Sequence, residues 1–194
     1  MTRRPVTMRA PALLGAVAGA LLLAACQGGE ADKGAAAQPS SETLAALVSQ
    51  ADDLSAVSAT LEDAGLAQVF DGAAAYTLLA PQDSAFDSLG AAGETLRSPE
   101  QRPAMVAVLR DHIVPGYLTP DDIAKAIELD DDGKVVMKTM GGHDLTFASA
   151  DGAITATAAD GATVRFAGEP LLASNGVAIP VDGLAVKVGG ASGS

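Results

Sequence analysis

Apolar side chains recur at helical spacing through the first half of the sequence, from residue 41 to residue 129. A serine or threonine precedes three of the periodic stretches and is typical of a helix cap, and a proline follows two of these caps at the first helical position. The expected caps are Ser40 or Ser41, Ser98 and Thr119. The expected buried faces are Leu44, Leu47 and Val48, then Leu54, Val57 and Leu61 with Gly65 closing the helix, and then Met105, Val106 and Leu109. The periodicity therefore predicts a mainly helical first half.

The stretch 76–86, YTLLAPQDSAF, changes its pattern at a single proline. The run 76–80 predicts a buried strand, and Pro81 ends it because proline has no N–H to donate to a strand ladder. Gln82 or Asp83 then begins a short helix that should turn Phe86 and Leu89 inward. We interpret this stretch as a structural joint between a sheet and the helices.

The second half changes to short runs with β-forming residues. Four strands are expected at 135–138, 144–148, 153–157 and 163–167, and two or three more between residues 170 and 188. The pairs Gly141-Gly142, Asp151-Gly152 and Asp160-Gly161 between the first four runs are strong hairpin signals. Helices followed by a strand meander predict an α+β fold.

Residues 1–25 have the pattern of a secretory signal peptide. Arg3, Arg4 and Arg9 precede an apolar run from residue 12 to residue 25. This run is shorter than the ~20 apolar residues that a membrane-spanning helix needs. A short membrane anchor or a core helix is the alternative, and Gly15 and Gly19 weaken it as a span.

Cys26 is the only cysteine of the chain, so no internal disulfide can form. Residues 23–26, Leu-Ala-Ala-Cys, resemble the lipobox of bacterial lipoproteins. That resemblance implies cleavage before Cys26 and attachment of diacylglycerol to its thiol, with palmitate-like acyl chains as the membrane anchor. An incidental cysteine after an ordinary signal peptide is the alternative. Residues 26–40 would form a flexible linker because they are rich in Gly, Ala and polar residues. Residues 189–194 are expected to form a disordered tail.

The charge balance excludes two classes of partner. The chain carries 12 basic and 24 acidic side chains, a net charge of −12. Loss of residues 1–25 removes three arginines and no acid, which leaves nine against 24, a net charge of −15. Such a domain is repelled by nucleic acid and by anionic membrane surfaces, so the lipid would have to hold it at the membrane.

Three segments together resemble the fasciclin (FAS1) domain. They are residues 77–86, TLLAPQDSAF, residues 109–116, LRDHIVPG, and residues 173–184, ASNGVAIPVDGL. In order, they are similar to the family's first signature, its central histidine motif and its second signature. The resemblance implies a single domain over residues 41–188, in which N-terminal helices pack on a β-sandwich or wedge. It also implies a binding or cell-adhesion module with an unknown surface protein or polysaccharide as ligand.

The central motif departs from the family pattern. Asp111 stands where relatives often have a tyrosine beside the histidine, so the integrin contacts credited to animal relatives at that pair do not transfer. Ile179 and Pro180 likewise replace the usual His and Val of the last signature. We expect His112 to be a buried residue that bonds to backbone groups, with a candidate binding face at His112, Ile113 and Val114.

No motif in the sequence indicates catalysis or a cofactor. His112 and His143 are the only histidines, and a zinc site usually needs three or four ligands, so no metal site is expected. His143 should be an exposed turn residue. The acidic stretch 128–134, ELDDDGK, lacks the ligand spacing of a calcium loop and is interpreted as a solvated loop. The nucleophile-elbow and phosphate-loop motifs are absent, so the chain is predicted not to be an enzyme.

Three functions of different classes remain. The chain is a lipid-anchored binding or adhesion module of the bacterial cell envelope, facing the periplasm or the exterior; or a structural envelope lipoprotein without a dedicated ligand; or an enzyme with an unrecognised site. The absence of catalytic motifs disfavours the enzyme, and the fasciclin resemblance favours the adhesion module.

Overall fold

The computed structural model describes residues 38–188. The expected signal peptide, Cys26, most of the linker and the expected tail lie outside the described residues. The helices are α1 (Leu44–Gln50), α2 (Ser55–Asp63), α3 (Ala67–Phe70), α4 (Asp83–Asp87), α5 (Ala91–Leu96), η1 (Pro99–Gln101), α6 (Arg102–Asp111) and α7 (Pro120–Leu129). The strands are β1 (Tyr76–Pro81), β2 (Ile113–Pro115), β3 (Lys134–Lys138), β4 (Asp144–Ala150), β5 (Ala153–Ala158), β6 (Thr163–Arg165), β7 (Leu171–Leu172) and β8 (Gly176–Val181).

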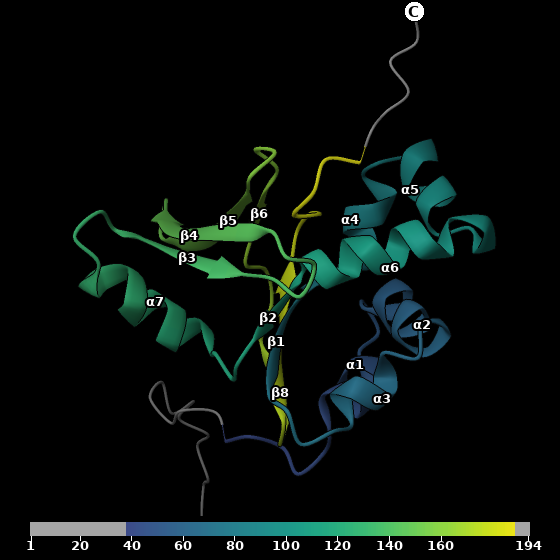
Figure 1. The fold of residues 1–194 in the computed structure, drawn as a ribbon, viewed down its shortest axis with the longest axis horizontal. Helices are drawn as coiled ribbons and strands as arrows, with labels where there is room; N and C mark the ends of the chain where they lie inside the picture. The colour runs from purple at the N-terminus through teal and green to yellow at the C-terminus, as the bar shows by residue number, and fades with distance from the viewer. Residues whose placement is uncertain (1–37, 189–194) are drawn as a thin grey trace, which may run out of the picture. The chain divides into compact units, whose positions relative to one another are not determined.

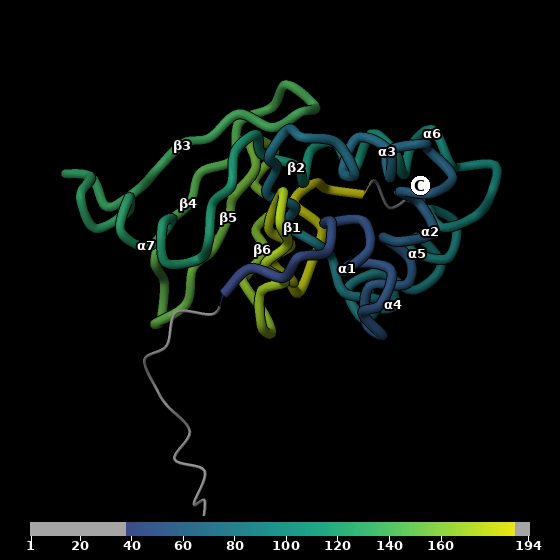
Figure 2. The backbone as a smooth tube through the Cα atoms, turned by 90° about the horizontal axis from the view of Figure 1, so that it is seen from below, coloured from purple at the N-terminus to yellow at the C-terminus, as the bar shows by residue number. Residues whose placement is uncertain are grey.

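The strands form two four-stranded sheets. The first has the order β2-β1-β8-β7, in which β1 and β8 are parallel and the outer pairs antiparallel. The second is the antiparallel meander β3-β4-β5-β6. Helices α1 to α6 gather on one side of the first sheet, and α7 and the meander lie on its other side (Figure 1; Figure 2). The predicted α+β architecture is confirmed.

Each side of the first sheet has its own hydrophobic core. Successive side chains of a strand point to opposite faces, so Leu78 of β1 packs among the helices and Leu79 packs against α7 and the meander. In β8, Ala178 and Ile179 divide between the two cores in the same way. The two central strands are therefore buried on both faces, which accounts for their nearly continuous apolar sequences.

The joint at residues 76–86 has the predicted form. Pro81 is the last residue of β1, Gln82 precedes α4, and the Phe86 side chain is fully buried. The Asp83 side chain accepts hydrogen bonds from the backbone N–H groups of Ser55 and Ala56, at 3.2 and 2.9 Å, so it ties α4 to the start of α2. The inward position predicted for Leu89 is wrong: it follows the end of α4 and is 36% exposed.

The helix caps are partly as predicted. Thr119 caps α7 in a reciprocal capping box with Asp122, and Ser98 precedes the short η1 turn that leads into α6. The cap of α1 is Thr43, whose side chain accepts from the Ala46 N–H, and neither Ser40 nor Ser41 has that role. The sequence interpretation also missed α3 and α5, which have no side-chain cap.

The meander has the three predicted hairpins. Gly142, Gly152 and Gly161 all have positive φ angles, which glycine adopts without the steric cost of a Cβ atom. Asp151, at φ 50°, is the only described non-glycine residue with positive φ, as a two-residue hairpin turn of type I′ requires at both central positions. The segment after residue 170 supplies two strands, β7 and β8.

Pro180 lies inside β8 without breaking the pairing with β1. Its carbonyl accepts a hydrogen bond from Ala167 N at 2.8 Å, on the side of the strand away from β1. Because the nitrogen and carbonyl of one strand residue point to the same side, the missing N–H also faces away from β1. This departure from the family pattern therefore costs no ladder bond.

Candidate binding site

The central histidine lies where α6 ends and β2 begins. His112 is completely buried, and its Nδ1 atom lies 2.8 Å from the Val108 carbonyl oxygen. Its Nε2 atom lies 2.8 Å from the Ala185 nitrogen. A carbonyl only accepts and a backbone N–H only donates, so Nδ1 carries the proton and Nε2 accepts. The expected role of His112, bonding to backbone groups from a buried position, is confirmed.

Burial lowers the pKa of His112 below its ordinary value, because the charged form would lose its hydration. The hydrogen bond to Val108 and the charge of Asp111 oppose this effect without reversing it. The ring is therefore neutral at neutral pH. Both its nitrogens are occupied and no part of it reaches solvent, so it offers neither a proton nor a contact to a ligand.

The neighbouring candidates are also inside the domain. Ile113 is 0% exposed and packs in the helical core, whereas Val114 is 4% exposed and packs in the core below the meander. Strand β2 sits between two cores, so its alternating side chains are covered on both faces. The accessible binding face predicted at His112, Ile113 and Val114 does not exist in the described structure.

A second histidine lies beside this junction. His143 Nδ1 is 2.8 Å from Asp111 Oδ1, with the His143 side chain 68% exposed and that of Asp111 17% exposed. The hydrogen bond to Asp111, and then its charge, raise the pKa of His143 above the ordinary value. The expected exposure of His143 is confirmed, but its pairing with Asp111 was missed. The two residues are 32 positions apart, and no local pattern signals the contact.

The turn that carries His143 is fixed to the junction by its backbone. Met140 N donates to the Ile113 carbonyl at 2.8 Å, and Gly141 N donates to the Arg110 carbonyl at 2.9 Å. A Cβ atom on Gly141 would overlap Asp111 Oδ1, so only glycine leaves room for the carboxylate in this position. The turn between β3 and β4 is thereby held against the end of α6.

Two small hollows flank the Asp111–His143 pair. One of about 210 Å³ has mainly apolar walls that include Leu145 and Val186. The other, of about 290 Å³, runs along the exposed face of α6 past Val106 and Arg110. Val106 was expected in the buried stripe of α6, but it is only partly buried and lines this second hollow.

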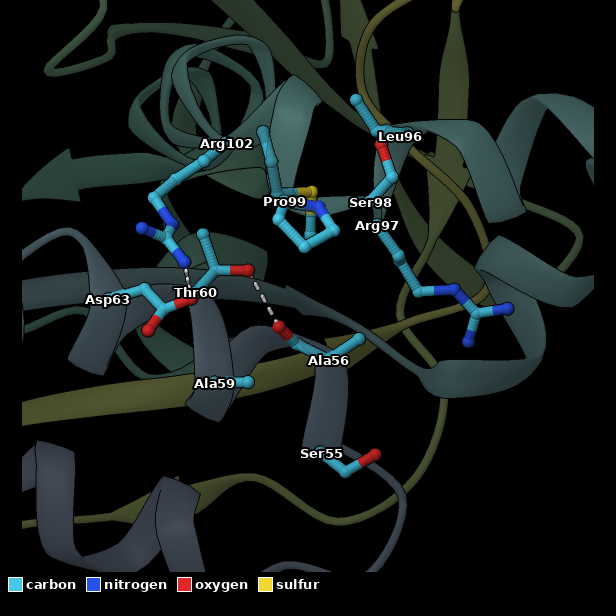
Figure 3. Close-up of a pocket in the computed structure, with 11 residues that line it drawn as sticks. Ser55, Ala56, Ala59, Thr60, Asp63, Leu96, Arg97, Ser98, Pro99 and Arg102 are labelled. Atoms are coloured by element: carbon cyan, nitrogen blue, oxygen red, sulfur yellow. Dashed lines mark hydrogen bonds and ion pairs between the residues drawn. The ribbon is translucent and has the colours of Figure 1, made fainter.

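A larger hollow, with a volume of about 430 Å³, lies between helices on the far side of α6. One wall is α2, from Ser55 to Asp63, and the other is the segment from Leu96 to Met105. Figure 3 shows Arg102 beside Asp63 at one end of the hollow and the Arg97 side chain at the other, with Ala56 and Ala59 between them. The sequence interpretation did not identify this hollow, because its residues come from separate helices.

Within residues 38–188, no three His, Cys, Asp or Glu side chains lie close enough to hold a metal ion. No helix in the same range is both long and apolar enough to cross a membrane.

Comparisons with known proteins agree with this fold. The sequence model of the fasciclin domain matches residues 52–186. The structure of a FAS1 domain pair from the insect cell adhesion molecule fasciclin I superposes with a TM-score of 0.64 at 13% identity, covering 75% of this chain. The match covers 51% of that domain pair, so this chain spans about half the length of the pair. No curated protein matches the chain. Since the family match spans most of its length, the chain belongs to the fasciclin family.

Proposed function

We propose that the protein is a lipid-anchored, extracytoplasmic adhesion module that binds a partner outside the membrane. Its membership of the fasciclin family carries this proposal, because fasciclin domains are associated with cell adhesion. The similar solved structure likewise comes from an insect cell adhesion molecule. The partner is a surface protein or polysaccharide.

The N-terminal sequence supports the anchoring. Cys26 follows an apolar, arginine-preceded segment and ends a stretch that resembles a lipobox. One acyl chain binds a membrane only marginally, at a constant of about 10⁴ M⁻¹, whereas two or more give stable attachment. With a net charge of −15 after signal removal, the domain has no electrostatic means of staying on an anionic membrane. The lipid on Cys26 is thus the attachment to the bacterial envelope.

The interior of the domain supports binding over catalysis. His112 is buried with both nitrogens bonded, so it cannot exchange a proton with a substrate. His143 is accessible and pairs with Asp111, but no described Ser, Thr or Lys side chain is hydrogen-bonded to its ring. The described domain instead has hollows on its surface, which suit the binding of a ligand.

The proposal is tested in a strain that lacks the protein, complemented with the wild-type chain or with Cys26→Ser. We expect loss of attachment or biofilm formation in the deletion strain, with the envelope still intact to dyes and detergents. The wild type should restore attachment, and Cys26→Ser should release the protein and restore none. Intact-mass analysis of wild-type protein should show acyl chains on Cys26.

Two outcomes would contradict the proposal. A leaky envelope with normal attachment favours a structural lipoprotein without a ligand. A mass that shows no acylation removes the anchoring part of the proposal.

A further inference from the structure

The hollow between α2 and α6 has the composition of a small-molecule site. Its volume of about 430 Å³ lies within the range of roughly 300–1,000 Å³ that is usual for ligand pockets. Its lining combines small or apolar side chains, among them Ala56, Ala59, Pro99 and Met105, with charged groups. Ligand pockets are typically built in this way, with apolar walls and a few polar groups that fix orientation.

Two guanidinium groups supply the polar contacts. Arg102 Nη2 lies 2.9 Å from Asp63 Oδ2, and Arg97 Nη2 lies 2.8 Å from Asp87 Oδ1. All four side chains are at least a third exposed, so these ion pairs contribute little stability and are free to be shared with a ligand. A guanidinium has five N–H donors, and each ion pair uses only part of that capacity.

The charges around the hollow favour a neutral ligand. Each guanidinium already faces a carboxylate, so the two pairs add no net charge. The chain as a whole has a net charge of −12, which repels anions. A hydroxyl group both donates and accepts, so it can bond to a guanidinium and to its carboxylate partner together. A ligand with adjacent hydroxyl groups on a compact ring could hydrogen-bond to both members of an ion pair at the rim. The C–H face of its ring could pack against Ala59 and Pro99.

We propose that this hollow binds one neutral sugar unit of an extracellular polysaccharide. The Arg102–Asp63 pair, and Arg97 at the other end, hold the hydroxyl groups, and the alanine-lined wall of α2 packs against the ring. The proposal rests on the adhesion function above and names the class of ligand and its place on the domain.

The test uses the full chain purified in detergent micelles and measures sugar binding by ligand-observed NMR titration. Methyl α-glucoside and methyl β-galactoside are the neutral probes, and glucuronate is the charged one. We expect saturable binding of at least one neutral glycoside and weaker binding of glucuronate. Ala59→Leu fills the hollow from an exposed position of α2 and should abolish binding. Arg102→Gln removes a charged donor and should weaken binding about tenfold.

Arg165→Gln is the matched control, because Arg165 is a partly exposed arginine of β6 that does not line the hollow. It should bind like the wild type, and melting curves show whether each variant is folded. Absence of saturable binding to the wild type, or unchanged binding in both Ala59→Leu and Arg102→Gln, overturns the site. Tighter binding of glucuronate than of either glycoside overturns the neutral class.

Attachment assays separate this proposal from the adhesion function. If cells carrying Ala59→Leu attach normally although the protein no longer binds glycosides, the hollow has no part in adhesion and this proposal fails alone. If cells lacking the protein attach normally, the proposed function itself fails.

Discussion

The Nε2 atom of His112 accepts a hydrogen bond from Ala185 N at 2.8 Å, which joins the end of α6 to the last described segment of the domain. The contact spans 73 residues of sequence and is buried. Replacing His112 with glutamine should leave one or both of the Val108 and Ala185 backbone groups without a partner. We expect the free energy of unfolding to fall by ~1–3 kcal/mol, measured by urea denaturation at pH 7.5.

The same histidine should make stability depend on pH. Burial lowers the folded-state pKa of His112, so below the ordinary value of about 6.5 the unfolded chain binds a proton that the folded domain does not. The stability that the neutral His112 ring contributes is fully present above pH 6.5 and is lost as the pH falls toward the lowered pKa. The wild type should lose stability by up to about 1.4 kcal/mol per pH unit more steeply than His112→Gln. Equal slopes over pH 7 to 5 would contradict the neutral ring.

His143 should titrate in the opposite direction. Its pairing with Asp111 raises the folded-state pKa, so this pair contributes stability below about pH 6.5 and loses it as the pH rises through the raised value. In Asp111→Asn, we expect the pKa of His143 to return toward its ordinary value, measured by NMR titration of the ring protons. Gly141→Ala should shift it in the same direction, because the added Cβ displaces the Asp111 carboxylate. Gly142→Ala supplies a comparison without a nearby contact, although its φ of +91° makes that change strained for a different reason.

Local signals in the sequence predicted the parts of the fold that short stretches determine. The strand–proline–helix joint at Pro81, the helix cap at Thr119 and the glycine-containing hairpins all depend on neighbours within a few residues. The helices α3 and α5 were missed because they have four and six residues and no side-chain cap at the N-terminus, so their local signals are weak and tertiary contacts are needed to stabilise them.

The candidate site was harder to predict because its contacts join distant segments. Ile113 and Val114 are buried because β2 lies between two cores. The same two apolar residues could occur in a strand with one face on the surface, so the sequence does not distinguish the two cases. The Asp111–His143 pair and the hollow beside α2 also need the tertiary fold. The burial of His112 followed from the sequence because it comes directly after an apolar helix face, and the exposure of His143 followed from its place in a turn.

Phe86 should be a main contributor to the stability of the helical core. Its side chain is 0% exposed, and the Arg97 guanidinium carbon lies 5.9 Å from the ring centroid. Phe86→Ala should lower the free energy of unfolding by ~3–5 kcal/mol, a large part of the ~5–15 kcal/mol typical of a domain. Leu89→Ala is the control. Because Leu89 is 36% exposed, this substitution should lower the free energy of unfolding much less. Similar losses for the two variants would show that the helix after Pro81 is rotated.

Asn175 should act as a three-way connector at the start of β8. Its Oδ1 accepts from Leu44 N at 2.9 Å, and its Nδ2 donates to the Gly72 carbonyl at 2.9 Å and to the Phe70 carbonyl. The side chain therefore ties α1 and the end of α3 to the first sheet. Asn175→Ala should lower the free energy of unfolding by ~1–3 kcal/mol, since it removes all three bonds at a partly buried position.

Asn175→Asp separates the accepting role of this side chain from its donating role. The new carboxylate still accepts from Leu44 N, but it faces the Gly72 and Phe70 carbonyls without a proton to donate. Its folded-state pKa should therefore lie above the ordinary value of about 3.9, because only the protonated acid can donate. The unfolded chain then loses its proton at a lower pH, so the destabilisation relative to wild type should be largest above pH 6 and shrink as the pH falls through the raised value. A loss of stability that stays constant from pH 7 to pH 4 would mean that the amide's donated bonds do not hold the segments together.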